Sequence, residues 1–279
     1  MKHIENSGEY AGLSVNKGIS QPPSINPYLA QKLQHRRREY TAAEYIEEIR
    51  KGNITVLSQA VTLVESQLPE HQTVAQEVIT GCLPYAGNSV RIGITGVPGS
   101  GKSTSIDTFG LHVLGRGGKL AVLAIDPSSE RSKGSILGDK TRMERLSQQQ
   151  NAFIRPSPSA GSLGGVARKT RETIILCEAA GFDTIFVETV GVGQSETAVH
   201  SMVDFFLLIQ LAGTGDELQG IKRGIMEMAD GIVINKADGN NIEKAKLAQA
   251  HFRNALHLFP PAPSGWTPQV LTYSGYYEI

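Results

Sequence analysis

Hydrophobic residues recur along the chain with two different periods, and the pattern changes near residue 89. Up to residue 82, apolar side chains recur at the spacing of an amphipathic helix. Thr41-Ala42-Ala43-Glu44 has the form of a helix-capping box, and Gly52 and Pro69 act as helix breaks. These signals predict a helical subdomain over residues 41–88. The sequence leaves open whether it packs on the rest of the chain or serves as a surface for a partner.

From Val90 onward, short apolar runs alternate with amphipathic segments. This alternation predicts an α/β fold with a mainly parallel sheet and helices on both faces, over residues 89–279. Residues 1–40 are mostly polar and rich in Gly, Ser, Pro and Asn, so we expect a flexible extension there. The predicted strands are Val90–Thr95, Leu120–Asp126, Phe153–Arg155, Thr184–Glu188, Phe205–Leu211, Gly231–Asn235 and Val270–Thr272.

Composition and charge exclude several classes of protein. The chain has 27 Lys+Arg and 27 Asp+Glu, so its formal net charge of zero provides no overall field for nucleic acid or an anionic membrane. No apolar run approaches the ~20 residues of a membrane-spanning helix, and the N-terminus lacks a signal peptide's apolar core. Cys82 and Cys177 lack metal-binding spacing, which favours buried thiols in a reducing compartment. We therefore expect a cytoplasmic protein without nucleic-acid or membrane partners.

A complete phosphate-binding motif follows the first predicted strand and precedes a helix predicted from Thr104 to about Leu114. Glycines allow backbone N–H groups to converge on a phosphate, and the helix N-terminus adds partial positive charge. The motif predicts a P-loop NTPase in which Lys102 neutralises phosphate oxygens and the Ser103 hydroxyl ligates Mg²⁺. The predicted nucleotide-binding residues here are Gly96, Val97, Pro98, Gly99, Ser100, Gly101, Lys102, Ser103 and Thr104.

A second motif is predicted to select the base of the nucleotide. Asn235-Lys236-Ala237-Asp238 follows a later strand, and a carboxylate at Asp238 accepts two N–H groups from guanine. Adenine lacks the 2-amino group, so a buried Asp238 would be left poorly paired, at a cost of ~1–3 kcal/mol. Asn235, Lys236 and Asp238 are therefore predicted to bind guanine. Ser274, Gly275 and Tyr276 follow the last strand and are added as candidates whose backbone N–H groups face the base oxygen.

Three acidic residues are candidates for binding magnesium and positioning water. Asp126 and Glu188 close predicted strands, and Asp139 lies in Gly138-Asp139-Lys140. Carboxylates beside a P-loop hold Mg²⁺ directly or through its waters. We expect Ser103, Asp126, Asp139 and Glu188 around the metal, and Lys102, Asp139 and Glu188 as the catalytic residues.

Several long runs resemble the methylmalonyl-CoA mutase-associated GTPases, a family that has also been labelled arginine/ornithine transport-system ATPase or kinase. The resemblance covers about residues 41–279 and is carried by Gly134 to Met143, Glu188 to Glu196 and Gly215 to Lys222, among others. It implies Mg²⁺-dependent binding and hydrolysis of GTP, with GDP as product. It also implies a chaperone that gates cofactor loading and protects an adenosylcobalamin-dependent methylmalonyl-CoA mutase. Gln219, Gly220 and Lys222 then belong to a switch through which the mutase influences hydrolysis.

The resemblance also implies a homodimer built largely by C-terminal helices. The chain stops at Ile279, so the sequence leaves open whether it is truncated or dimerises differently. The main alternative function is a kinase or ATPase linked to arginine or ornithine transport, although Asp238 disfavours adenine. A metal-insertion GTPase lacks support because the His and Cys residues are scattered, and a scaffold without turnover is disfavoured by the intact catalytic set.

Overall fold

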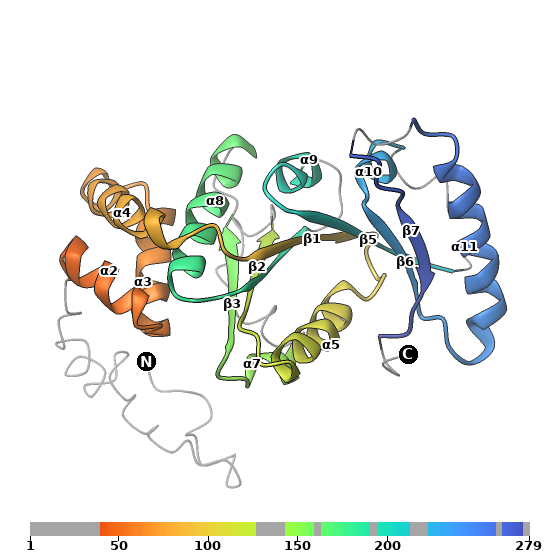
Figure 1. Ribbon diagram of the computed structural model, residues 1–279, viewed down its shortest axis with the longest axis horizontal. Helices are drawn as coiled ribbons and strands as arrows, with labels where there is room; N and C mark the ends of the chain where they lie inside the picture. The colour runs from red at the N-terminus through yellow and green to blue at the C-terminus, as the bar shows by residue number, and fades with distance from the viewer. Residues whose placement is uncertain are drawn as a thin grey trace, which may run out of the picture. The chain divides into compact units, whose positions relative to one another are not determined.

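A parallel sheet of seven strands, in the order β3-β2-β4-β1-β5-β6-β7, forms the centre of the fold (Figure 1). The structure is a computed structural model and describes residues 40–126, 143–158, 163–189, 195–212, 223–260 and 264–275. Because all strands run the same way, their carboxyl ends share one edge of the sheet. The strands are β1 (Val90–Gly96), β2 (Leu120–Asp126), β3 (Ala152–Pro158), β4 (Thr184–Thr189), β5 (Phe205–Leu211), β6 (Gly231–Asn235) and β7 (Gln269–Thr272).

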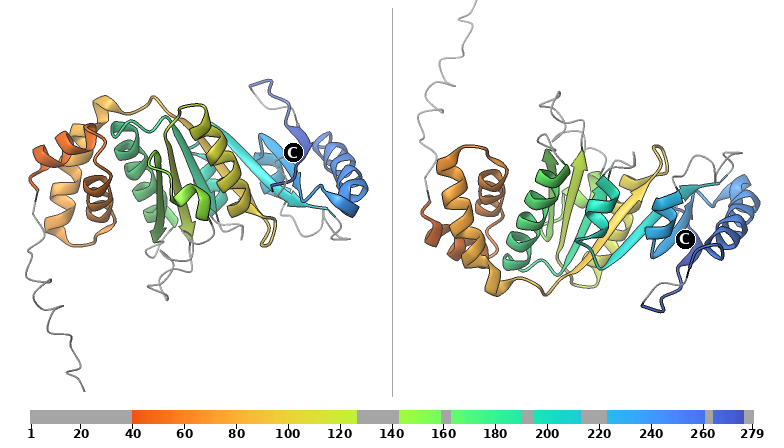
Figure 2. Two further views of the ribbon diagram at one scale, coloured as in Figure 1. Left: turned by 90° about the horizontal axis from the view of Figure 1, so that it is seen from below. Right: turned by 90° about the horizontal axis from the view of Figure 1, so that it is seen from above.

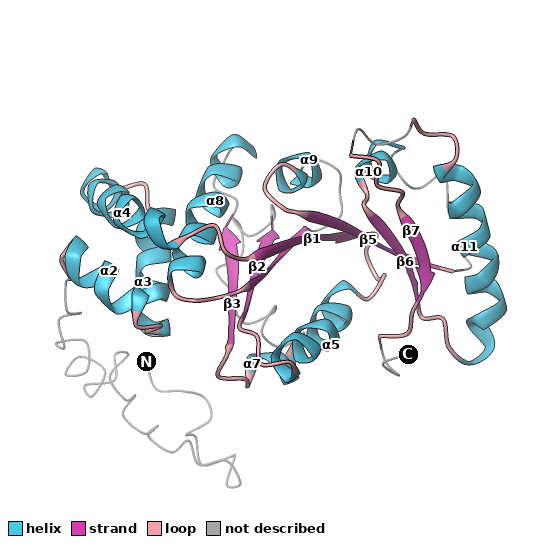
Figure 3. Cartoon of the chain, viewed as in Figure 1, coloured by secondary structure: helices cyan, strands magenta, loops and turns pink. Residues whose placement is uncertain are grey.

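Helices cover both faces of the sheet, as the sequence predicts (Figure 3). Helices α5 (Lys102–Gly115) and α7 (Glu144–Ser147) pack on one face through Ile106 and Leu146. The opposite face is covered by α8 (Leu163–Ala179), α9 (Ser195–His200), α10 (Arg223–Met228) and α11 (Ile242–Leu256). Adjacent strand residues alternate between the two cores: Val122 lies in the α5 core and Leu123 in the α8 core. Among the helices described, none is long and apolar enough to cross a bilayer.

Three helices precede the sheet and pack beside α8 (Figure 2). They are α2 (Ala42–Arg50), α3 (Ile54–Glu65) and α4 (Pro69–Cys82), followed by the short η2 (Leu83–Tyr85). The predicted capping box is present, since the Thr41 N–H donates to a Glu44 carboxylate oxygen at 2.8 Å. The apolar sides of these helices and the α8 face of the sheet form one continuous core, so the helical segment packs on the sheet.

The sequence placed the strands correctly but misplaced several ends. Strands β1, β3, β4 and β7 extend beyond the predicted bounds, and α5 begins at Lys102, two residues before the predicted start. Apolar side chains recur at helical spacing up to Leu68, just before the predicted break at Pro69, yet α3 ends at Glu65 and Leu68 is 57% exposed. The chain must turn there to start α4 at Pro69, so Leu68 points to solvent. Cys82 and Cys177 are fully buried free thiols, as expected.

A buried carboxylate fixes the start of the central strand. Glu178 of α8 has a side chain only 1% exposed and accepts hydrogen bonds from the Gly87 N–H at 2.7 Å and the Ser89 hydroxyl at 2.6 Å. The Arg91 guanidinium donates to the same carboxylate at 2.7 Å. These contacts hold the segment between η2 and β1, so the strand that ends at the phosphate-binding motif starts from a fixed position.

Candidate functional site

The predicted nucleotide-binding residues that the structure describes lie at the carboxyl edge of the sheet. Strands β1, β5, β6 and β7 are consecutive neighbours, and three of the segments that leave this edge lie within the described residues and carry predicted nucleotide-binding residues. They are the P-loop (residues 96–103), the 235–238 loop after β6 and the 274–275 turn after β7. Parallel pairing alone therefore brings together segments that lie more than a hundred residues apart in the sequence.

The P-loop adopts a conformation that depends on its glycines. Gly101 caps α5 with φ +86°, in the left-handed region that other residues rarely adopt. A Cβ at Gly101 would lie 2.5 Å from the Asn235 side-chain nitrogen, and a Cβ at Gly96 would lie 2.2 Å from the Ile209 carbonyl oxygen. Both glycines are thus required by close neighbours as well as by backbone angles.

Lys102 is folded over the loop that it follows. Its ammonium group donates to the Gly96 carbonyl at 2.7 Å and to the Val97 carbonyl at 3.3 Å. Ser103 is half-buried in the first turn of α5, and Thr104 is exposed beside it. A cation, a hydroxyl and a helix N-terminus at one place form a site suited to an anion such as phosphate.

Asn235 joins all three loops. Its side chain is buried, and the amide nitrogen donates to the Ser100 carbonyl of the P-loop at 2.8 Å. The amide oxygen accepts the Lys236 N–H at 2.7 Å and the Gly275 N–H at 3.1 Å. One side chain therefore holds the candidate phosphate-binding and base-binding segments together.

Asp238 and Ser274 form a second link between the 235–238 loop and the 274–275 turn. The buried Ser274 hydroxyl donates to an Asp238 carboxylate oxygen at 2.6 Å, which orients the acid predicted to read guanine. Lys236 has φ +59°, and the Asn241 amide donates to its carbonyl at 2.7 Å. The Gly275 N–H, one of the groups that the sequence assigned to the base oxygen, donates here to Asn235.

The candidate metal residues are placed only in part. Glu188 lies in β4, half-buried, with Ala124 of β2 and Ile94 of β1 as its register partners. Asp126 ends β2, but its side chain lies outside the described residues, as do Asp139, Tyr276, Gln219, Gly220 and Lys222. Within the described part of the chain, no group of three His, Cys, Asp or Glu residues is arranged to hold a metal ion. The magnesium and switch residues therefore stay predictions.

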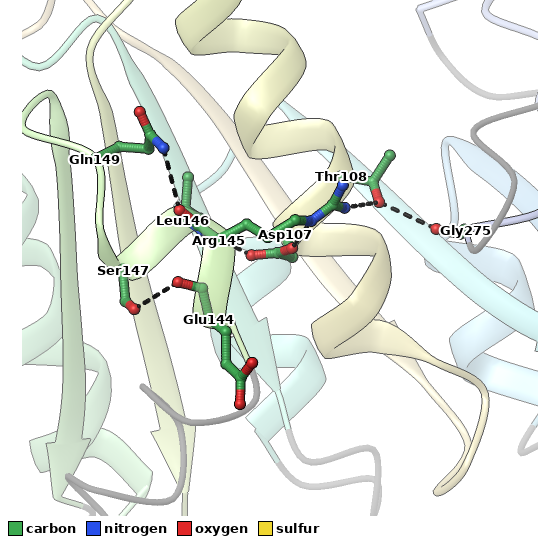
Figure 4. A network of polar contacts seen from close by, with 8 residues as sticks. All are labelled: Asp107, Thr108, Glu144, Arg145, Leu146, Ser147, Gln149 and Gly275. Carbon is green, nitrogen blue, oxygen red and sulfur yellow. Dashed lines mark hydrogen bonds and ion pairs between the residues drawn. The ribbon is translucent and has the colours of Figure 1, made fainter.

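Sequence reasoning missed a polar network beside the site. Asp107 and Thr108 of α5 contact Arg145 of α7, and the Thr108 hydroxyl reaches the Gly275 carbonyl (Figure 4). Nothing in the sequence marks these residues, because Asp107 and Arg145 are 38 positions apart and match no motif. Only the packing of α7 on α5 brings them into contact.

Comparison with known proteins agrees with this geometry. The chain is 59% identical over 224 residues to a putative GTPase of Caulobacter vibrioides, covering 80% of this chain and 68% of that protein. It is 52% identical over 236 residues to the GTPase ArgK of Escherichia coli, covering 85% and 71%. A crystal structure described as an LAO/AO transport system kinase superposes with a TM-score of 0.73 at 43% identity, covering 87% of this chain and 72% of that one.

The family model of the methylmalonyl-CoA mutase-associated GTPase MeaB matches residues 57–278, which include the P-loop, the 235–238 loop and the 274–275 turn. The match spans most of the chain, and the relatives above are aligned over two thirds or more of their own lengths. The chain therefore belongs to the family of methylmalonyl-CoA mutase-associated GTPases.

Proposed function

We propose that this GTPase binds GTP and GDP across the P-loop, the 235–238 loop and the 274–275 turn. The observation that supports this most directly is the Asn235 side chain, which bonds all three segments at once. A nucleotide needs its phosphates and its base held at a fixed separation. A brace between the two candidate binding segments provides that separation before any ligand arrives, which reduces the ordering cost of binding.

The base-selecting role is assigned to Asp238. Its carboxylate accepts one hydrogen bond from Ser274, which leaves acceptor positions for the N1–H and 2-amino groups of guanine. The phosphate role is assigned to Lys102 and to the N–H groups of the P-loop. Lys102 is held by the carbonyl oxygens of Gly96 and Val97, so its charge lies over the loop.

Hydrolysis by this family requires water to attack the γ-phosphate in line, with the protein positioning groups and neutralising charge. We assign Mg²⁺ to Ser103, Asp126, Asp139 and Glu188. Hydroxyl and carboxylate oxygens are the ligands that this ion prefers, and Ser103 and Glu188 come from the first turn of α5 and from β4 beside β1. A bound magnesium ion would neutralise charge on the β- and γ-phosphates.

The partner follows from the family and not from the geometry. The matched family is described as associated with methylmalonyl-CoA mutase, so we propose that the chain is a cytoplasmic chaperone for an adenosylcobalamin-dependent mutase of that type. It would gate cofactor loading and protect the loaded enzyme. Gln219, Gly220 and Lys222 are proposed as the segment through which the mutase alters hydrolysis.

The test is phosphate release from GTP, with ATP as the control nucleotide, in the presence and absence of purified methylmalonyl-CoA mutase. We expect turnover of GTP only, and faster turnover when the mutase is added. No turnover of GTP would refute the enzymatic proposal. Turnover that ignores the mutase would refute the assigned partner alone. Transfer of the γ-phosphate to arginine or ornithine would instead support a kinase.

Two variants test the assigned residues. Lys102→Ala should abolish tight nucleotide binding, whereas Lys246→Ala, which removes a lysine paired with Glu243 on the surface of α11, should not. Asp238→Asn keeps an oxygen for the Ser274 hydroxyl but turns an N–H₂ group toward the guanine N–H groups, so it should lose GTP affinity while remaining folded. Binding is measured by titration with a fluorescent GDP analogue. Normal binding by either site variant would show that its residue is wrongly assigned.

A further inference from the structure

A charged contact between two helices lies next to the candidate base-binding turn. Asp107, in the second turn of α5, has a side chain 9% exposed. One of its carboxylate oxygens accepts from Arg145 Nε of α7 at 2.7 Å, and the other accepts the Leu146 N–H at 2.8 Å. Both oxygens are therefore engaged, and they fix where the guanidinium of Arg145 lies (Figure 4).

The Thr108 hydroxyl extends this contact to the 274–275 turn. It accepts from a terminal nitrogen of Arg145 at 3.1 Å and donates to the Gly275 carbonyl at 3.1 Å. A hydroxyl has a single hydrogen to donate. Because Arg145 can only donate, it fills the acceptor side of the hydroxyl, so the hydroxyl hydrogen is directed to Gly275. Thr108 is buried, so water does not readily replace either bond.

Gly275 is thus held from two sides. Thr108 bonds its carbonyl, and Asn235 accepts its N–H at 3.1 Å. The residue before it, Ser274, orients the carboxylate of Asp238 at 2.6 Å. A short chain of contacts therefore leads from Arg145 through Thr108 and the 274–275 turn to the acid assigned to guanine.

We infer that Arg145 is a positioning residue for guanine selection, acting through Thr108 and the 274–275 turn with Asp107 as its anchor. The inference rests on the proposed function, because it assigns these residues to the same base-binding site. The Arg145 side chain is 51% exposed, and its guanidinium is held by a buried acid and a buried hydroxyl. The position of the guanidinium is therefore set by Asp107 and Thr108.

The test compares the affinities for GDP and for inosine diphosphate (IDP), which lacks the 2-amino group read by Asp238. Partial unfolding lowers both affinities equally, so their ratio reports the placement of Asp238 and not stability. Arg145→Ala and Thr108→Val should lower GDP affinity about three- to tenfold, the loss typical of one or two hydrogen bonds, and should bring the GDP/IDP ratio closer to one. Thr108→Ser keeps the hydroxyl and should restore the ratio.

The matched control is Arg168→Ala, which removes an arginine that pairs with Glu172 at 2.8 Å on the exposed side of α8. It should leave both affinities unchanged. If the wild-type protein does not prefer GDP to IDP, the guanine assignment itself fails and the inference fails with it. If the wild type prefers GDP and the Arg145 and Thr108 variants keep the full ratio, only the positioning role is refuted. Arg145→Ala removes a side chain that is 51% exposed, so this variant is expected to fold even if Thr108→Val does not.

Discussion

Replacing Asn235 with alanine tests whether one side chain holds the site together. The change removes three hydrogen bonds of 3.1 Å or less and a longer one to the Ser105 hydroxyl at 3.5 Å. Two of the groups left behind by the shorter bonds, the Ser100 carbonyl and the Gly275 N–H, are buried. Each unsatisfied buried group costs about 1–3 kcal/mol, whereas water can replace the bond to the part-buried Lys236 N–H. We therefore expect a loss of about 2–6 kcal/mol in the free energy of unfolding, a large share of the ~5–15 kcal/mol typical of a domain.

Two further variants separate the contribution of the Asn235 amide nitrogen from that of an exposed hydrogen bond in the same loop. Asn235→Asp keeps an oxygen for the N–H groups of Lys236 and Gly275, but it places the other oxygen against the Ser100 carbonyl, where the amide donated at 2.8 Å. Two acceptors facing each other repel, so aspartate should destabilise at least as much as alanine. Asn241→Ala removes one exposed hydrogen bond to the Lys236 carbonyl and serves as the control, with an expected loss below about 1 kcal/mol.

The assay is urea unfolding followed by circular dichroism, without nucleotide, so that ligand binding does not contribute to stability. A thermal melt should show the Asn235 variants unfolding roughly 4–24 °C below the wild type, from about 2–4 °C per kcal/mol for a domain of this size class. An Asn235→Ala protein within about 0.5 kcal/mol of the wild type would refute the reasoning, since surface substitutions fall in that range.

Three further changes have defined outcomes. Gly101→Ala should lower the free energy of unfolding by at least about 1 kcal/mol more than Gly99→Ala. Both glycines have positive φ, but only at Gly101 would the added Cβ contact another side chain, that of Asn235. Urea unfolding midpoints measure the difference. Burial raises the pKa of Cys82 to about 11 and also raises the pKa of Cys177, so a thiol reagent at pH 8 should label neither before unfolding. The native thiols stay protonated to a higher pH than the unfolded ones, so the free energy of unfolding should fall as pH rises from about 9 to 11. A free energy of unfolding that stays constant over this range would contradict the burial argument. Glu178→Gln should cost about 1–3 kcal/mol, since it removes the anion of the Arg91 guanidinium and turns an N–H₂ group toward the donors that the carboxylate accepts, and a change under about 0.5 kcal/mol in the melt would argue against that anchor.

The sequence determined the local parts of this protein. Strand and helix periods, the capping box at Thr41 and the glycine spacing of the P-loop are short-range patterns, and each was placed correctly or within a few residues. The two candidate nucleotide-binding motifs could also be recognised in the sequence, because each needs particular residue types at fixed spacing. Element ends were less accurate, since a helix such as α3 stops where the chain must turn to pack, and not where its apolar pattern stops.

Tertiary structure decided how those parts meet. The order of strands in the sheet brings β7 beside β6, and only then does the 274–275 turn reach Asn235 and Asp238. The contact of Asp107 with Arg145 depends on α7 packing across α5, which no local pattern encodes. Local sequence sets which backbone conformations of a segment are low in free energy. The packing of the whole sheet decides which distant side chains share a buried hydrogen bond. Each such bond forms only when the two segments that carry its donor and acceptor are already in place.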